Sequence, residues 1–235
     1  MPTVSPTCAP PANFDRIARP YRWLEYLSFG PMLEHCRFFR LPQLASARRA
    51  LVLGDGDGRF LVHLLAANPT LHADVVDQSP AMLRLLHARV AALHAEDRVT
   101  IHETDALAFI PTGAYDLIAT HFFLDCFPTD QILSLAHTIR PHLAPNALWL
   151  VSEFAIPSGL AAVPARLLVA SLYLAFRLIT GLRTHALPDH PAVLARTGLT
   201  LRHRKTFLSG LLVSELWQLD PDPQQTYNPL QNQSL

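Results

Sequence analysis

The chain has 235 residues, of which 50% are hydrophobic and 16% are charged, and its formal net charge is zero. This length suffices for one domain with a packed core and is too short for two full domains. The balanced charge provides no basic surface of the kind that nucleic-acid-binding domains use, so we expect no nucleic-acid partner.

The cysteines and histidines predict neither disulfides nor metal. Cys8, Cys36 and Cys126 are odd in number and widely spaced, and the twelve histidines lack metal-ligand spacing. The N-terminus has no basic and apolar regions of a signal peptide, and no apolar run reaches the roughly 20 residues of a membrane span. We therefore expect a cytoplasmic protein without a metal.

The first part of the chain is expected to precede the main sheet. Residues 1–13 are rich in proline and predict a flexible N-terminus. A helical pattern begins at Phe14, and Pro20 should divide it into two short helices with Tyr21 at the break. A further helix is expected over 32–39, so residues 14–45 form a set of N-terminal cover helices.

A strand followed by a glycine-rich turn is the most informative stretch. Residues 50–60 read ALVLGDGDGRF, which predicts a strand, a tight turn and a helix start, as in the first unit of an open α/β sheet. The spacing G-x-G-x-G differs from the G-x-G-x-x-G fingerprint of dinucleotide sites. Asp55 and Asp57 would repel a pyrophosphate and attract a cation, which favours S-adenosylmethionine (SAM) over NAD. The structural alternative is a turn with solvated aspartates.

Strands and helices then alternate along the chain. An amphipathic helix with Phe60, Leu61 and Leu64 on one face follows the glycine turn, and a second helix begins at Ser79 and Pro80. A third is expected over 129–142. Further strands are expected at 72–77, 99–104, 115–120 and 147–154. This alternation predicts parallel βαβ units with right-handed connections.

The periodicity changes after the fifth strand. Residues 158–182 predict a long helix, with Pro164 as a candidate kink, that is apolar nearly all round and therefore buried, pocket-lining or interfacial. This helix belongs to a helical insertion over 158–198. Strands at 200–207 and 211–219, joined by a short turn, must pair antiparallel. Residues 220–235 are polar and predicted to be disordered.

Polar residues stand where the expected strands end. Asp77 ends the second strand, 23 positions after Gly54, where an acidic residue reaches ribose hydroxyls in nucleotide-type folds. His121, Asp125 and Glu153 follow the fourth and fifth strands, and His121 is the best placed for general-base chemistry at neutral pH. Each has a structural alternative: a solvated strand end for Asp77, a backbone-bonded histidine for His121 and a helix cap for Asp125.

Taken in order, the motifs over residues 50–219 resemble those of class I SAM-dependent methyltransferases. The segment VLGDGDGRF resembles their SAM-binding motif. Asp77 corresponds to the acidic residue at the end of the second strand that holds the ribose. Thr104-Asp105-Ala106-Leu107 resembles the motif whose aspartate contacts the adenine amino group. The segment Phe14–Ala18, with Tyr21, resembles the opening of ubiquinone/menaquinone-type methyltransferases, which folds over SAM.

This resemblance implies a fold, a cofactor and a set of site residues. The implied fold is α/β, with a Rossmann-like, seven-stranded, mostly parallel sheet, a C-terminal antiparallel hairpin and a helical lid, all within one domain over 14–219. The implied cofactor is SAM, and the product is S-adenosylhomocysteine. The residues expected to bind it are Tyr21, Gly54, Asp55, Gly56, Asp57, Gly58, Asp77, Gln78, Asp105, Ala106, His121 and Phe122.

Two departures from the family pattern matter. Val52 stands where the family usually carries a carboxylate that anchors the methionine end of SAM, so we transfer that role to Asp55 or Asp57 as a hypothesis. The Asn/Asp-Pro-Pro-Tyr signature of enzymes that methylate amides and adenine amines is absent after the fourth strand. Its absence argues against DNA or RNA bases as acceptors.

The predicted activity is SAM-dependent methyl transfer to a hydrophobic or aromatic small molecule, such as a quinone-, polyketide- or lipid-like compound. His121 and Asp125 are the expected catalytic residues. The alternatives are a non-catalytic, methyltransferase-like regulatory protein that binds SAM or S-adenosylhomocysteine, and the less favoured NAD-dependent oxidoreductase. Besides the apolar acceptor, a membrane surface and a second copy of the chain are candidate partners.

Overall fold

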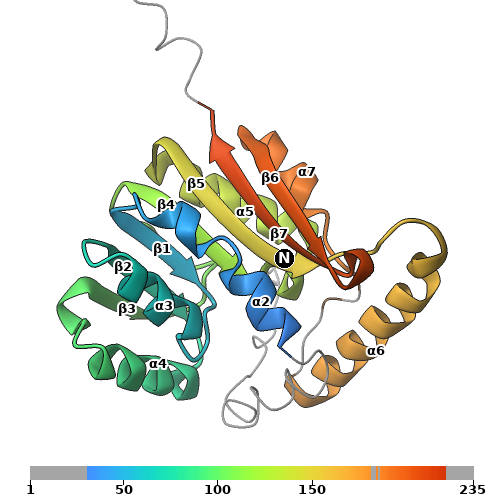
Figure 1. Cartoon of the computed structure of the whole chain (residues 1–235), viewed down its shortest axis with the longest axis horizontal. Helices are drawn as coiled ribbons and strands as arrows, with labels where there is room; N and C mark the ends of the chain where they lie inside the picture. Colours follow the sequence, from blue (N-terminus) through green and yellow to red (C-terminus); the bar gives the residue numbers. More distant parts are fainter. Residues whose placement is uncertain (1–30, 181–183, 185, 221–235) are drawn as a thin grey trace, which may run out of the picture.

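The computed structural model describes residues 31–180, 184 and 186–220. The expected N-terminal segments before residue 31, including Tyr21, and the expected tail beyond residue 220 lie outside the described residues. Seven strands form one sheet, in the order β3-β2-β1-β4-β5-β7-β6 (Figure 1). This confirms the expected Rossmann-like α/β fold.

The strand order creates a switch point in the middle of the sheet. The strands are β1 (Arg49–Leu53), β2 (His72–Asp77), β3 (Val99–Glu103), β4 (Tyr115–His121), β5 (Leu143–Phe154), β6 (Leu199–Phe207) and β7 (Leu212–Leu219). The first five pair in parallel, and β7 pairs antiparallel with both β5 and β6. The chain runs outward from β1 to β3 and returns at β4. Ligands of open α/β sheets bind beside such a reversal, at the carboxyl ends of the strands.

Helices cover both faces of the sheet. They are α2 (Met32–Phe38), α3 (Arg59–Ala67), α4 (Pro80–Ala92), α5 (Thr129–Ile139) and α7 (His190–Arg196), while a further helix, α6 (Ala162–Thr180), lies apart from both faces (Figure 1). Successive strand residues point to opposite faces, so Val52 packs with α3 and α4 while Leu53 packs in the core under α5 and α7. Both side chains are almost fully buried. An apolar core therefore covers each face of the sheet, and the carboxyl ends of the strands form the edge where a ligand site can lie.

Three element boundaries differ from the sequence expectation by more than two residues. Strand β5 begins at Leu143 instead of 147, because Leu143 pairs with Tyr115 before an irregularity in the register. The expected helix over 129–142 ends at Ile139 and continues as a 3₁₀ turn, η5 (Arg140–His142). The expected helix at 158 begins with a 3₁₀ turn, η6 (Gly159–Ala161), and Pro164 lies in the first turn of α6, where proline is tolerated.

Helix α6 lies beyond the carboxyl end of β5 and not on either face of the sheet (Figure 1). It buries one stripe, formed by Ala165, Val169 and Tyr173, and leaves most of its other described apolar side chains exposed. Of the three alternatives expected for this helix, buried, pocket-lining or interfacial, full burial does not hold for its described side chains. In the ranges that the structure describes, no helix combines the length and apolar character needed to cross a membrane.

Strand β6 forms one edge of the sheet and presents a basic run. Its residues 202–205 read Arg-His-Arg-Lys and are all exposed. Positive side chains on an edge strand hinder the pairing of a second sheet with its free backbone groups.

We expect Gly58→Ala to destabilise the fold more than Gly159→Ala does. Both glycines have positive φ, 79° and 74°, where a Cβ costs about 1–2 kcal/mol. A Cβ on Gly58 would also lie 2.7 Å from Leu86 of α4, which adds roughly 1–3 kcal/mol of overpacking, whereas nothing lies within 4 Å of that position on Gly159. Urea unfolding followed by circular dichroism measures both; equal losses would contradict the packing argument.

Candidate functional site

The glycine loop leaves β1 at the switch point and lies beside the end of β4. Gly54 donates its N–H to the carbonyl of Val76 in β2 at 2.9 Å. A Cβ on Gly54 would lie 2.0 Å from the ring of Phe123, which follows β4. The loop therefore joins the carboxyl ends of three strands, and only glycine fits at its first position.

Asp55 holds the start of α3. Its carboxylate accepts hydrogen bonds from the N–H groups of Phe60 at 3.3 Å and Leu61 at 2.9 Å. Burial raises the pKa of Asp55 to about 7, although the nearby charge of Arg37 and these two amides oppose the shift. Asp55 is therefore only partly ionised at neutral pH and faces a helix N-terminus.

Asp57 belongs to a chain of ion pairs. Its carboxylate lies 3.0 Å from Nε of Arg59 and 2.8 Å from Nη2 of Arg89 in α4. Arg59 also pairs with Glu34 of α2 at 2.9 Å. These pairs connect α2, the glycine loop and α4. Because two guanidinium groups already engage Asp57, it is a weaker candidate than Asp55 for a cationic ligand group.

Asp77 connects the end of β2 to both neighbouring loops. Its Oδ2 accepts from the N–H of Gly56 at 3.1 Å, and its Oδ1 accepts from the N–H of Ser79 at 2.9 Å. Asp77 and the adjacent Gln78 are half-buried. The carboxylate is thus fixed at the carboxyl edge, directly beside the glycine loop.

The two expected residues after β3 lie at the same edge. Asp105 accepts a hydrogen bond from the N–H of Leu107 at 2.9 Å, and Ala106 is buried in the core beside Val76. Thr104 donates its N–H to the carbonyl of Asp77 at 3.1 Å, which fixes this loop next to the end of β2. The ends of β1, β2 and β3 therefore carry most of the predicted cofactor-binding residues together.

His121 is the last residue of β4, and its ring packs against Phe60 in the first turn of α3. Its Nδ1 is 2.9 Å from Oγ of Ser152, and its ring centroid is 4.2 Å from that of Phe60. Its Nε2 is buried and has no hydrogen-bond partner among the described residues. Burial, together with the charge of Arg37, lowers the pKa of His121 well below its usual value. The imidazole is therefore neutral at physiological pH.

Arg37 of α2 is a charged group that the sequence motifs did not reveal. Its side chain is only 5% exposed, and its guanidinium carbon lies 5.7 Å from the ring centroid of Phe122. Its charge acts on both Asp55 and His121. Phe122 itself has a φ of 51°, an uncommon value for a non-glycine residue, and its N–H donates to the carbonyl of Ser152 at 2.7 Å. An isolated arginine on a short helix gives no sequence signal for this position.

Two carboxyl groups lie near the carboxyl ends of β4 and β5: Asp125 follows β4 and is half-buried, and Glu153 is a buried residue of β5. Glu153 accepts the N–H groups of Phe123 at 3.0 Å and Leu124 at 2.8 Å through Oε1. Its Oε2 is buried without a partner among the described residues, and the residue is 2% exposed. Asp125 lies in the 3₁₀ turn η4 (Leu124–Cys126).

The pKa values of both carboxyl groups are raised. Burial raises the pKa of Asp125, and burial together with the charge of Asp125 raises the pKa of Glu153 well above its usual value. Two enclosed carboxyl groups whose charges act on each other cannot both ionise freely. Acid and base roles are commonly divided between such neighbouring groups.

Helix α6 encloses the pair from the outside. The hydroxyl of Tyr173 donates to the carbonyl of Asp125 at 3.1 Å, and Oγ1 of Thr184 donates to the carbonyl of Cys126 at 2.7 Å. Val169 and Leu211 pack with Cys126 in a small apolar cluster. Turn η4 is therefore held by one hydrogen bond and an apolar contact from α6 and by a second hydrogen bond from Thr184, which follows the helix.

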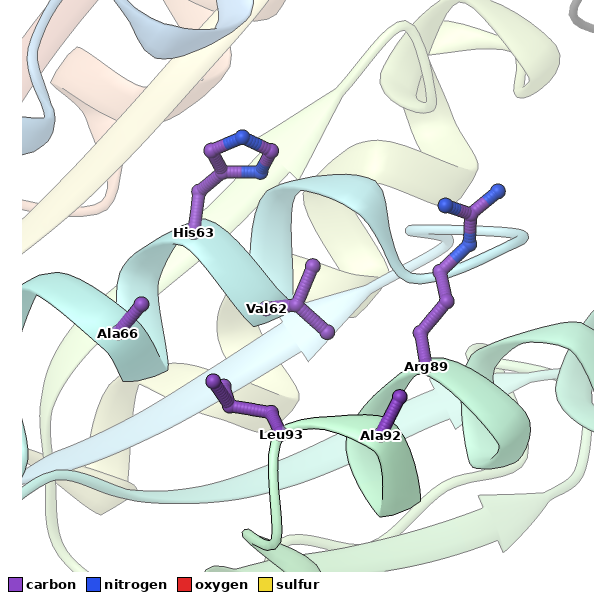
Figure 2. Close-up of a pocket in the computed structure, with 6 residues that line it drawn as sticks. All are labelled: Val62, His63, Ala66, Arg89, Ala92 and Leu93. Carbon is purple, nitrogen blue, oxygen red and sulfur yellow. The ribbon is translucent and has the colours of Figure 1, made fainter.

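A surface groove lies apart from these residues. It has a volume of about 320 Å³ and is lined by Val62, His63, Ala66, Arg89, Ala92 and Leu93. Figure 2 shows Val62, His63 and Ala66 on α3, Arg89 and Ala92 on the neighbouring α4, and Leu93 directly after α4. The groove holds none of the predicted site residues. Among residues 31–180, 184 and 186–220, no three His, Cys, Asp or Glu side chains are grouped to hold a metal.

The domain and the fold have known relatives. Residues 51–149 match a family model described as a methyltransferase domain. Among curated proteins, the chain is similar to polyamine aminopropyltransferase 2 of Ralstonia nicotianae, at 29% identity over 227 residues, 83% of this chain and 43% of the relative. It is also similar to polyamine aminopropyltransferase 2 of Bacillus cereus, at 30% identity over 106 residues, 42% of this chain and 28% of the relative. The chain thus spans less than half the length of these relatives.

Solved structures share the fold at low sequence identity. An O-methyltransferase family protein from Burkholderia thailandensis matches with a TM-score of 0.65 and 17% identity over 88% of this chain and 62% of that one. The mitomycin 7-O-methyltransferase MmcR matches with a TM-score of 0.64 and 18% identity, covering 88% and 60%. The SAM-dependent methyltransferase SibL matches with a TM-score of 0.65 and 20% identity, covering 91% and 63%.

The raised pKa of Asp55 predicts a specific pH dependence of stability. A carboxyl group whose pKa is higher in the folded state contributes stability below its unfolded pKa, near 4, and that contribution is lost as pH rises through about 7. In the Asp55→Asn variant, the asparagine would keep an oxygen that can accept the α3 amides but cannot ionise. We therefore expect the unfolding free energy of the wild type, relative to that of Asp55→Asn, to fall between pH 4 and 7. Urea titrations at several pH values would show a constant difference if Asp55 were not buried as described.

Proposed function

We propose that the chain is a class I SAM-dependent methyltransferase that transfers a methyl group to a hydrophobic or aromatic small molecule, as its matched methyltransferase domain and its fold indicate. The domain and the fold imply SAM as the cofactor. The main support is the arrangement of the carboxyl edge, where Asp77 and the glycine loop stand on one side of the switch point and the enclosed Asp125–Glu153 pair stands on the other.

The residues at this edge fit the chemical groups of SAM. Each carboxylate oxygen of Asp77 accepts an amide N–H, and a carboxylate fixed in this way would also accept hydrogen bonds from the ribose hydroxyls. Gly56 has a φ of 60°, and the nearest atom to a Cβ there would be the sulfur of Met82 at 3.6 Å, so a ligand can approach its backbone closely. Asp105 and Ala106 would face the adenine. The role of Tyr21, which lies outside the described residues, stays a prediction.

The methionine end of SAM carries an ammonium and a carboxylate. Asp55 would bind the ammonium, and the buried guanidinium of Arg37, whose charge acts on Asp55, would bind the carboxylate. This pair supplies the anchoring that Val52 cannot provide. His121, being neutral and enclosed, would line this part of the site without a charge of its own.

The chemistry of the acceptor would depend on the carboxyl pair. SAM, when bound, supplies a methyl group on a sulfonium, which an acceptor oxygen, nitrogen or carbon can attack in line. Asp125, with its raised pKa, would take the acceptor proton near neutral pH. Glu153, kept protonated by burial, would hold turn η4 through Oε1 and donate a hydrogen bond from Oε2. Helix α6 would exclude water.

A second candidate reaction is aminopropyl transfer, which the resemblance to the polyamine aminopropyltransferases favours. Its donor, decarboxylated SAM, has the same sulfonium and lacks the carboxylate. Arg37 would then lose the carboxylate that it would bind in SAM, and its charge would repel the cationic aminopropyl arm. The buried arginine beside the glycine loop therefore favours SAM as the donor. A third candidate is binding of SAM or S-adenosylhomocysteine without turnover.

Calorimetric titration tests the donor and its binding residues. We expect the wild type to bind SAM more tightly than decarboxylated SAM, and Asp77→Ala to weaken SAM binding about 10–100-fold through lost charge-assisted hydrogen bonds. Asp97→Ala, on an exposed residue of the turn before β3, is the matched control and should leave the affinity unchanged. Tighter binding of decarboxylated SAM would favour aminopropyl transfer, and no binding of either compound would refute the proposed cofactor site.

Single-turnover assays with a panel of phenolic and quinol acceptors test the chemistry. We expect Asp125→Asn to slow methyl transfer at least about 100-fold at neutral pH while SAM affinity stays unchanged, because the general base is removed. The wild-type rate should rise with pH through a range above the usual Asp pKa, since burial raises the pKa of this carboxyl group. Asp130→Asn, on an exposed residue of α5, is the control.

Two outcomes would contradict this assignment. An unchanged rate in Asp125→Asn would show that this residue is not the base. SAM binding without any methylated product across the panel, or in a metabolite extract, would favour the non-catalytic alternative.

A further inference from the structure

The outer side of α6 exposes a concentration of apolar side chains. Of the nine large hydrophobic residues that are exposed in the described ranges, five lie in η6 and α6, although these elements are a small part of the chain. Val163 is 63% exposed, Leu167 is 69% exposed and Leu174 is 58% exposed, while Leu160 is completely exposed. Scattered exposed hydrophobic residues are ordinary, but a contiguous group marks an interaction surface.

The direction of this surface is fixed by contacts on the opposite side of the helix. Val163, Leu167 and Leu174 follow helical spacing and lie on one face, whereas Ala165, Val169 and Tyr173 form the buried stripe. The hydrogen bond from Tyr173 to the carbonyl of Asp125 anchors that stripe on η4. The apolar row therefore points away from the sheet. Figure 1 shows α6 standing apart from the sheet and from the other labelled helices.

The charges on α6 indicate what kind of partner it meets. The helix contains Arg166 and Arg177, both exposed, and no aspartate or glutamate. A second copy of the same surface would bring arginines together with no carboxylate on either helix to pair with them. A bilayer of anionic phospholipids offers both an apolar interior for the leucines and negative headgroups for the arginines.

We propose that α6 is an interfacial helix whose outer face lies on an anionic phospholipid bilayer. The helix lies along the surface and does not cross it, in agreement with the absence of a membrane-crossing helix among the described residues. This surface does not depend on the proposed reaction. If that reaction holds as well, the enclosed Asp125–Glu153 pair lies directly beneath the lipid-facing helix, and apolar acceptors could reach it from the bilayer.

Vesicle co-sedimentation of the full chain, without SAM or acceptor, tests the proposal. We expect binding to vesicles of phosphatidylcholine with phosphatidylglycerol and little binding to pure phosphatidylcholine. Leu167→Glu should weaken the binding about tenfold or more, because it removes a leucine that the bilayer would bury and adds a negative charge. Arg166→Gln and Arg177→Gln should each weaken it about fivefold and reduce its dependence on salt.

The matched control is Ile110→Glu. Ile110 is 74% exposed but lies in the connection between β3 and β4, so the same substitution there should leave vesicle binding unchanged. Circular dichroism shows whether each variant keeps its fold, and light scattering gives its mass. No binding to anionic vesicles, equal losses in Leu167→Glu and Ile110→Glu, or a dimer that Leu167→Glu converts to a monomer would each overturn the proposal. Because SAM titration is separate, either proposal can fail alone.

Discussion

Two carboxylates on either side of one loop determine how this protein can present a ligand site. Asp55 accepts the first amides of α3, and Asp77 accepts the N–H of Gly56, so a backbone with three positive φ values is held between a helix and a strand. The glycines have no side chains that could accept hydrogen bonds, so without these two carboxylates the backbone N–H groups of the loop and of the start of α3 would lose their acceptors. The order of the strands then places the end of β4, with Phe123 against Gly54, beside the same loop.

Much of the fold can be predicted because its signals are local. The bounds expected for β2 are correct, since the apolar pair Val75 and Val76 ends in Asp77 and is followed by a serine cap and a proline. The antiparallel pairing of β6 with β7 could be predicted because the connection between them is too short for a parallel crossover. The start of β5 escapes prediction because Pro145 and Asn146 resemble a turn, and the pairing of Leu143 with Tyr115 depends on a strand far away in the sequence.

The candidate site was less accessible, because its properties come from contacts between distant segments. The sequence shows that Asp55 and Asp57 share a loop, but their different roles depend on a helix start in one case and on Arg89, 32 residues away, in the other. Burial of Arg37 and the contact of Glu153 with η4 also require the folded chain. The amphipathic character of α6 could not be predicted from its composition, since which residues are covered depends on Tyr173 reaching η4.

The basic edge of β6 also affects how copies of the chain meet. Two such edges brought side by side would place four cationic or protonatable residues of one copy against four of the other, so a continuous intermolecular sheet is electrostatically opposed. The chain has a single lysine, Lys205, and it lies in this run. Modification of that amine would remove one of these positive charges and weaken the opposition to strand pairing, while the two arginines would stay charged. The basic residues of β6 thus oppose aggregation, and none of them belongs to the candidate ligand site.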